Sequence, residues 1–278
     1  MVFFKNKAVK ILCIVFAVII LLVSTLFIGA RVRRDWKPWS PNYDKVNIVD
    51  ILNKPTLTND DYNLLYRQTG LTKLGIDGLL EKGEKSTILK IQDYFFESQD
   101  IYYKDFAPLM GYMRRHKDSY VPHAALENGD ILFSPSTFLS FIEMGHSAMV
   151  INEDSETLIQ ASGYGTPSNT VTANNIFVRP AFIVLRVNAD YTTRNAVSTY
   201  AKQELMKLDY DILAGIFEPK APENIKKTHC SHIVWYAYNH FGIDVDGTGG
   251  KIVTPLDLTL SENVSVVQIY GIDIEKYN

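Results

Sequence analysis

Cysteine is scarce in this chain. Only two cysteines, Cys13 and Cys230, occur among its 278 residues. Cys13 lies inside a long apolar segment near the N-terminus, so the folded part of the chain cannot form an internal disulfide. A domain without disulfides must be stabilised by the packing of its core, and such a domain is compatible with either side of a bacterial membrane.

A surplus of basic charge is also missing. The sequence has 28 Lys and Arg against 31 Asp and Glu, which gives a formal net charge of −3. It contains no basic stripe and no nucleic-acid-binding motif, so we expect no nucleic-acid partner. No segment is of low complexity, and 46% of the residues are hydrophobic. This composition predicts one sizeable domain with an appendage.

The appendage is the N-terminal segment. Residues 11–30 are almost all apolar, and no charge occurs between Ile11 and Gly29. This length suffices to span a bilayer as a helix. It is long for a cleaved signal peptide, and Ile28 is too large for a good cleavage site. We therefore predict a short flank over 1–10, an uncleaved signal anchor over 11–30 and a linker over 31–45, with a cleaved signal as the alternative.

The residues that flank this segment do not decide its orientation. Three lysines precede it and four basic residues follow it before residue 38, so the positive-inside rule hardly discriminates. Trp36 and Trp39 follow the segment closely. They suit the interfacial belt of a membrane, and packing on the folded domain is an equally good interpretation.

Residues 46–125 are interpreted as a helical lead-in region. Thr58 is a helix cap followed by acidic residues, and Gly70 is a stop signal. Further short amphipathic segments, each predicted to be helical, occupy 74–80, 88–96 and 101–113.

From Leu126 onward the pattern changes to strands. We expect strands near 129–133, 146–152, 157–161, 177–187 and 264–270, with helices over 193–208 and after residue 228. The strands are flanked by helices without regular alternation. Residues 126–278 are therefore predicted to form an α+β domain with a mainly antiparallel sheet.

The second cysteine lies at a predicted helix start. Gly242 ends this helix, and apolar residues recur at helical spacing at Ile233, Val234, Ala237 and Phe241. Cys230 then falls in the first turn, with Thr228 as the N-cap. Unpaired N–H groups and the positive end of the helix dipole favour the nucleophilic thiolate there. The alternative is that Cys230 is a small buried hydrophobic residue.

A cysteine nucleophile needs an imidazole within hydrogen-bond reach and a polar group that orients the ring. His146 opens the apolar run 146–152, which reads as a buried strand. Neighbouring strands lie about 4.8 Å apart, and Gln160 is the polar residue in the middle of the next one. We predict that Cys230, His146 and Gln160 form a catalytic set. Gln160 pointing to solvent is the alternative.

Several short motifs together resemble the YiiX-like, circularly permuted branch of the NlpC-type papain-like superfamily. In this branch the histidine precedes the cysteine, as it does here. The resemblance covers about residues 126–270 and is carried by Gly129-Asp130-Ile131, Gly145-His146-Ser147-Ala148-Met149-Val150, Ile159-Gln160-Ala161, Cys230-Ser231-His232-Ile233-Val234-Trp235, Gly242-Ile243-Asp244 and Thr254-Pro255-Leu256-Asp257-Leu258.

This resemblance implies a papain-like core with the nucleophile helix packed on the sheet. Cys230 would be the nucleophile, His146 the base and Gln160 the third residue, although YiiX-like members more often carry glutamate there. Tyr210 resembles a tyrosine that relatives place near the oxyanion site, and a core tyrosine is the alternative. The backbone N–H of Cys230 is the more secure oxyanion donor. The resemblance also favours a single-pass protein of the cell membrane with an extracytoplasmic catalytic domain.

The leading functional interpretation is a membrane-anchored cysteine hydrolase that cleaves amide or peptide bonds, with cell-wall peptidoglycan as a candidate substrate. A lipid-directed acyl hydrolase or acyltransferase is the alternative, and it would need a long apolar groove beside Cys230. An inactive binding module on the same fold is a third interpretation. A zinc site built from His146, His229, Cys230 and His232 matches no common spacing, so we expect no metal and no other cofactor.

Overall fold

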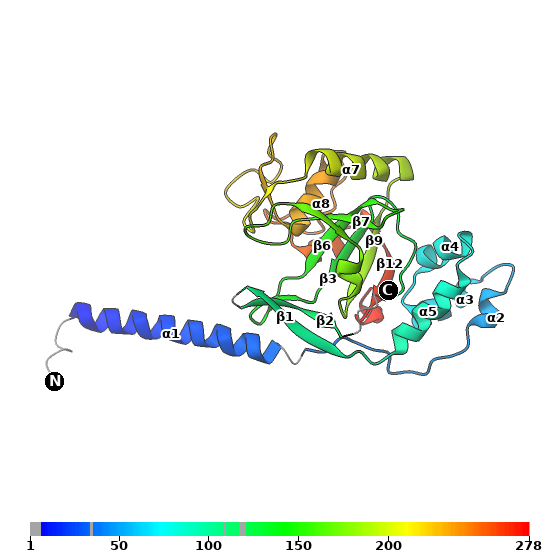
Figure 1. Ribbon diagram of the computed structural model, residues 1–278, viewed down its shortest axis with the longest axis horizontal. Helices are drawn as coiled ribbons and strands as arrows, with labels where there is room; N and C mark the ends of the chain where they lie inside the picture. The colour runs from blue at the N-terminus through cyan, green and yellow to red at the C-terminus, as the bar shows by residue number, and fades with distance from the viewer. Residues whose placement is uncertain (1–6, 34–35, 108, 117–120, 278) are drawn as a thin grey trace.

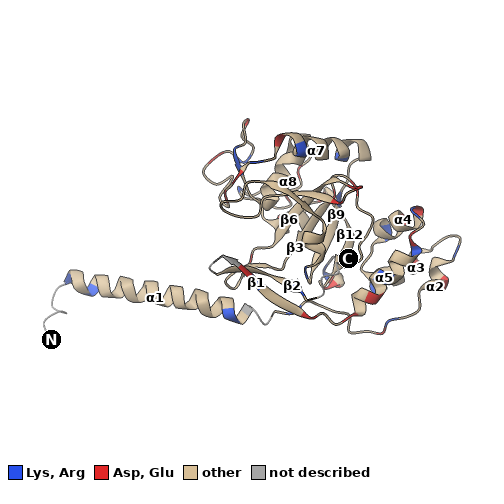
Figure 2. Ribbon diagram, in the orientation of Figure 1, with Lys and Arg blue, Asp and Glu red and all other residues tan. Residues whose placement is uncertain are grey.

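The computed structural model describes residues 7–33, 36–107, 109–116 and 121–277 (Figure 1). Its first element is α1 (Lys7–Arg33), which projects from the rest of the molecule as a single long helix. Within the span Lys7–Val32, an 18-residue window has a mean hydropathy of 3.3, and none of that window is buried inside the protein. Basic residues lie near both ends of α1, with none between them (Figure 2). This helix is long and apolar enough to cross a membrane, as predicted.

Four helices follow at the far side of the molecule from α1 (Figure 1). They are α2 (Val49–Leu52), α3 (Asn59–Thr69), α4 (Lys73–Glu81) and α5 (Lys85–Phe96). The predicted start of α3 is confirmed, because Thr58 and Asp61 form a reciprocal capping box. Gly70 ends α3 with a φ of 71°, and a Cβ there would lie 2.0 Å from the backbone oxygen of Ile269. Only glycine permits this close approach to the sheet.

The prediction of a helix over 101–113 is wrong. These residues belong to a hairpin of β1 (Ile101–Ala107) and β2 (Met110–Arg115), paired from Ile101 opposite Arg115. Burial along β2 alternates from residue to residue, which is the period of a strand. The segment is too short for periodicity alone to separate the two structures. With β4 (Thr137–Leu139) and β5 (Ile142–Glu143) the hairpin forms a four-stranded sheet in the order β1-β2-β4-β5.

The main sheet has six strands in the order β12-β9-β3-β6-β7-β8, and every adjacent pair is antiparallel. The predicted α+β class with a mainly antiparallel sheet is therefore confirmed. The strands are β3 (Ile131–Ser134), β6 (His146–Asn152), β7 (Thr157–Gln160), β8 (Asn169–Thr172), β9 (Phe182–Val187) and β12 (Val264–Tyr270).

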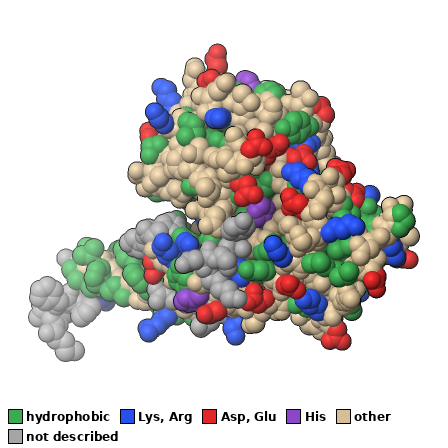
Figure 3. Space-filling view, turned by 45° about the vertical axis from the view of Figure 1, so that its right-hand side comes forward, with side chains coloured by type: hydrophobic (Ala, Val, Ile, Leu, Met, Phe, Trp, Pro, Cys, Tyr) green, Lys and Arg blue, Asp and Glu red, His purple; other side chains and the backbone are tan. Residues whose placement is uncertain are grey.

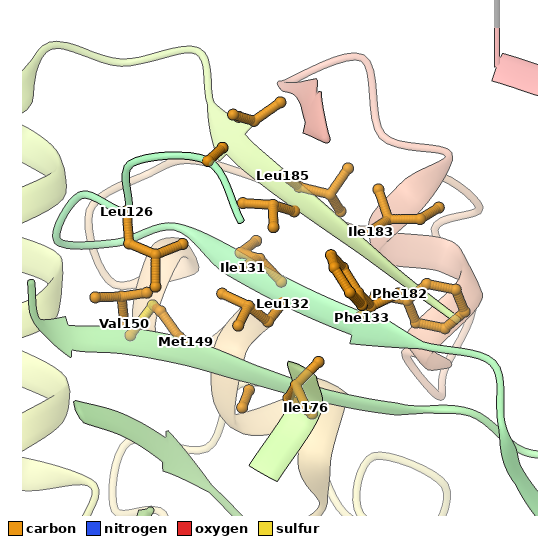
Figure 4. Packing of buried hydrophobic residues seen from close by; sticks show 14 of the residues in the cluster. Leu126, Ile131, Leu132, Phe133, Met149, Val150, Ile176, Phe182, Ile183 and Leu185 are labelled. Atoms are coloured by element: carbon orange, nitrogen blue, oxygen red, sulfur yellow. The ribbon is translucent and has the colours of Figure 1, made fainter. Parts of the chain in front are cut away.

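Both faces of the central strands are covered, since every residue of β3 and β9 is buried. Figure 4 shows apolar side chains of β3, β6 and β9 packed together, among them Ile131, Met149 and Ile183. Two helices, α7 (Tyr191–Glu204) and α8 (Cys230–Asn239), pack against β6. The sheet is thus a rigid base for side chains at the start of β6. The remaining elements are α6 (Asn174–Phe177), β10 (Asp209–Tyr210), β11 (Lys227–Thr228), α9 (Pro255–Thr259) and a 3₁₀ turn over Ile274–Tyr277.

Both linker tryptophans pack on the folded region. The ring centroid of Trp39 lies 5.8 Å from that of Phe95, and the Trp39 backbone N–H donates to the carbonyl of Gly271 at 3.0 Å. The ring centroid of Trp36 lies 6.0 Å from that of Phe138. The linker therefore holds the end of α1 close to the four-stranded sheet.

Candidate active site

Cys230 is the first residue of α8, as the sequence predicts, but the N-cap is His229 rather than Thr228. The Nδ1 of His229 accepts a hydrogen bond from the backbone N–H of His232 at 3.4 Å. Thr228 belongs to β11, whose parallel pairing with β10 holds it in the extended conformation one residue before the cap. The observed N-cap differs from the predicted one because this pairing is a tertiary contact that no local sequence pattern reveals.

Cys230 is half-buried where α8 packs against β6. Burial raises its pKa, and hydrogen bonds from the Ser147 and Ser231 backbone N–H groups oppose this effect. The direction reverses the one expected from the helix start alone, because loss of water disfavours the thiolate more than these donors favour it. The resting cysteine is accordingly a neutral thiol.

His146 begins β6 and is buried, as predicted. Its Nε2 lies 2.8 Å from Oε1 of Gln160 at the end of β7. Met149 pairs with Ile159 in the β6–β7 register, so the next position places Gln160 opposite Ala148. His146 is two residues from Ala148, so the side chains of His146 and Gln160 lie on the same face of the sheet. The structure thus brings the predicted base and its predicted orienting residue into contact.

A hydrogen-bonded chain behind His146 fixes its tautomer. The carbonyl of Pro167 can only accept, so Nδ2 of Asn169 donates to it at 3.0 Å. Oδ1 of Asn169 then faces Nε2 of Gln160 at 3.5 Å, and this leaves Oε1 of Gln160 to accept from His146. His146 therefore carries its proton on Nε2, and Nδ1 is the basic nitrogen. Sequence reasoning missed Asn169, although counting across the next hairpin places it opposite Gln160.

Sequence reasoning also missed a buried cation at the site. Arg179 is 5% exposed; it donates to Oγ1 of Thr137 at 2.6 Å, and its guanidinium carbon lies 4.9 Å from the ring centroid of Tyr112. Burial, and next the charge of Arg179, lower the pKa of His146 to about 3. The charge of Arg179 also interacts with Cys230. The site therefore disfavours imidazolium and provides a cation for a thiolate. No sequence pattern marked Arg179.

Cys230 and His146 line the same cleft, which has a volume of about 420 Å³. Tyr210 of β10 also lines it, and burial raises the pKa of its hydroxyl, which stays protonated. Most of the other wall residues are apolar and include Met110, Ile142, Met144, Ile212, Ile252, Val253, Pro255 and Leu256. The cleft is therefore lined mainly by apolar side chains, with Thr137, Glu143, Ser162 and Thr254 among the polar ones.

The two other histidines near Cys230 serve the fold. His232 uses both ring nitrogens, one with Oγ1 of Thr228 at 3.1 Å and one with the carbonyl of Lys220 at 2.8 Å. His229 uses Nδ1 as the helix cap. Among the described residues, no group of three or more His, Cys, Asp or Glu side chains could hold a metal ion.

Comparison with known proteins found no family model, no curated protein and no solved structure that matches this chain. The resemblance to the YiiX-like branch therefore remains a prediction.

Proposed function

We propose that this chain is a membrane-anchored cysteine hydrolase that acts through a thioester, on a papain-like core in circularly permuted order. The observation that carries the proposal is that Cys230, at the start of α8, and His146, held by Gln160 and Asn169, line one cleft. The chain order of histidine, glutamine and cysteine agrees with permutation. Helix α1 would be the single membrane span.

The reaction would begin from the neutral pair. As the sulfur of Cys230 attacks the substrate carbonyl, Nδ1 of His146 takes the thiol proton, and a C–S bond forms. The backbone N–H of Cys230 and the hydroxyl of Tyr210 would donate to the resulting oxyanion. The tetrahedral adduct collapses, the bond to the leaving amine or alcohol breaks, and His146 returns the proton to that group. Water then hydrolyses the thioester to a carboxylic acid and the free thiol.

The cleft supports an acyl group with an apolar chain better than a polar wall peptide. Its walls present isoleucine, methionine, valine and leucine side chains, and its apolar lining residues outnumber the polar ones. An amide or peptide bond, including one in peptidoglycan, undergoes the same chemistry and remains the leading alternative substrate class. The apolar lining favours a lipid-directed acyl hydrolase or acyltransferase as the more specific proposal.

Acylation of the thiol tests the proposal without knowledge of the natural substrate. Full-length protein in detergent would be incubated with 4-nitrophenyl acetate and 4-nitrophenyl octanoate, and the acylated peptide identified by mass spectrometry. We expect acylation at Cys230 in the Cys13→Ser protein. In the same background, Cys230→Ser should show no acylation at position 230, and His146→Ala should be acylated at Cys230 more slowly.

Chain length tests the substrate class separately. Each additional buried CH₂ contributes about 0.8 kcal/mol, or about fourfold in kcat/KM. We expect the octanoyl ester to react faster than the acetyl ester. Equal rates for both esters would contradict the lipid-directed proposal, whereas the absence of any acylation would favour an inactive binding module.

A further inference from the structure

The turn between β4 and β5 lies against α1. The hydroxyl of Ser140 donates to the backbone carbonyl of Leu26 at 2.5 Å. A Cβ at Gly29 would lie 2.5 Å from a ring carbon of Phe141 and 2.8 Å from Oγ of Ser140. Glycine at this position therefore lets the turn pack directly on the helix. The contact joins the four-stranded sheet to the apolar part of α1.

This contact lies on the apolar part of α1, N-terminal to Arg31. Arg31 is the first charged residue after the apolar run, and Leu26 precedes it by about 8 Å along the helix axis at 1.5 Å per residue. Both Leu26 and Gly29 belong to the span Lys7–Val32, which is long and apolar enough to cross a membrane. If Arg31 lies among the headgroups, the turn lies at the boundary between headgroups and acyl chains. Segments that lie in this interface insert about 5–10 Å.

The turn exposes the side chains that such a position needs. Phe141 and Ile142 are adjacent at the tip of a short hairpin, and they are 52% and 44% exposed. No charged residue occurs from Ser136 to Ile142, and the exposed Glu143 that ends β5 lines the Cys230 cleft. Two large apolar side chains in water would be unfavourable, whereas the same side chains in a lipid interface would be stabilised.

The turn also forms part of the catalytic cleft. Ile142 is exposed at the tip and lines the cleft of Cys230. A second hollow shares Phe133, Glu143 and Leu256 with this cleft and continues to Trp36, which follows α1 in the chain. A hollowed surface therefore runs from Cys230 toward the end of α1, with Trp36, Phe133, Leu256 and Leu260 as its large apolar side chains and Lys37, Glu143, Asp273 and Lys276 among its charged ones. Figure 3 shows the apolar surface of α1 projecting from the body of the molecule.

We propose that the β4–β5 turn inserts into the lipid leaflet adjacent to the catalytic region, so that the open end of the Cys230 cleft is seated on the membrane surface. The partner is the bilayer that α1 spans. This inference rests on the part of the proposed function that makes α1 the membrane span, and it is independent of the reaction at Cys230. It follows that an apolar substrate would enter the cleft from the leaflet.

Depth-dependent fluorescence quenching tests the insertion. Full-length protein would be reconstituted into phosphatidylcholine and phosphatidylglycerol vesicles, and single cysteines labelled with an environment-sensitive dye. Phe141→Cys and, as a second position, Ile142→Cys would be placed in a Cys13→Ser/Cys230→Ser background. Val49→Cys in the same background is the matched control, because Val49 is 41% exposed on α2 at the far side of the molecule. The Cys230→Ser protein, labelled at Cys13, reports on α1.

We expect nitroxide-labelled acyl chains to quench the dye at positions 13, 141 and 142 and not at position 49, with blue-shifted emission at the quenched positions. Quenching at position 13, with positions 141 and 142 behaving like position 49, would overturn the insertion and leave the anchor in place. Absence of quenching at position 13 would overturn the anchor and the insertion together. Neither result depends on whether Cys230 is catalytic.

Discussion

The Nε2 of His146 lies 2.8 Å from Oε1 of Gln160, and this contact decides which nitrogen of the ring carries the proton. A glutamine oxygen can only accept, so it holds the proton on Nε2 and leaves Nδ1 unprotonated, as the proposed mechanism requires of the base. A neutral amide also adds no charge that would stabilise imidazolium. The pair therefore rests as thiol and imidazole and would become charged only during the reaction.

Gln160→Glu should change this resting state. A carboxylate that accepts from Nε2–H favours imidazolium, so the pKa of His146 should rise from about 3 and a thiolate–imidazolium pair should form near neutral pH. We expect faster iodoacetamide alkylation of Cys230 in the Cys13→Ser background, with a new inflection in the rate against pH. Gln160→Ala is the control and should show no such inflection. A Gln160→Glu profile that matches the parent protein would contradict this electrostatic account.

Asn169→Ala should weaken catalysis without weakening substrate binding. The substitution removes the partner that orients Gln160, and one neutral hydrogen bond contributes about 1 kcal/mol, or about fivefold in rate. We expect kcat for ester hydrolysis to fall by about that factor with little change in KM. Thr170→Ala, at the next and exposed position of β8, is the matched control. A rise in KM at constant kcat would assign Asn169 to substrate binding instead.

Arg179→Met should make the thiol less reactive. Loss of the buried cation removes an interaction that favours the thiolate, and a shift of one pKa unit would slow alkylation at pH 8 about tenfold. Arg179→Lys retains the charge and should retain most of the reactivity. Thr137→Val separates the charge from the hydrogen bond that Arg179 donates to Thr137. If Arg179→Lys were as slow as Arg179→Met, shape rather than charge would explain the effect.

Acid should destabilise the fold through its buried histidines. Burial, and next the charge of His232, lower the pKa of His229 to about 3 from its ordinary value of 6.5. As pH falls, the unfolded chain therefore binds this proton at a higher pH than the folded protein does. The free energy of unfolding is unaffected by titration of His229 above pH 6.5 and decreases as pH falls from 6.5 toward 3. At pH 4.5 the loss from His229 is at most about 2.7 kcal/mol.

His229→Asn isolates this contribution, because asparagine can cap α8 and does not titrate. We expect its thermal unfolding midpoint, followed by tryptophan fluorescence in detergent, to equal that of the parent near pH 7 and to fall less at pH 4.5. The same acid loss in both proteins would show that His229 does not set the pH dependence.

The sequence by itself determined the features that depend on neighbouring residues. These are the long apolar helix, the capping box at Thr58, the strand that begins at His146 and the helix that begins at Cys230. The contact between His146 and Gln160 was also predictable, because a short hairpin places both residues on one face. In each case the physical cause lies within a few residues, or within one turn, of its effect.

The tertiary structure alone decided the rest. Residues 101–115 pair as strands because β4 offers an edge to β2, and Thr228 loses the cap because β10 holds it in a strand. Burial between α8 and β6 reverses the expected direction of the Cys230 pKa, and Arg179 reaches the site from a distant segment. Desolvation and long-range charge depend on what surrounds a group in space, which local sequence patterns do not record.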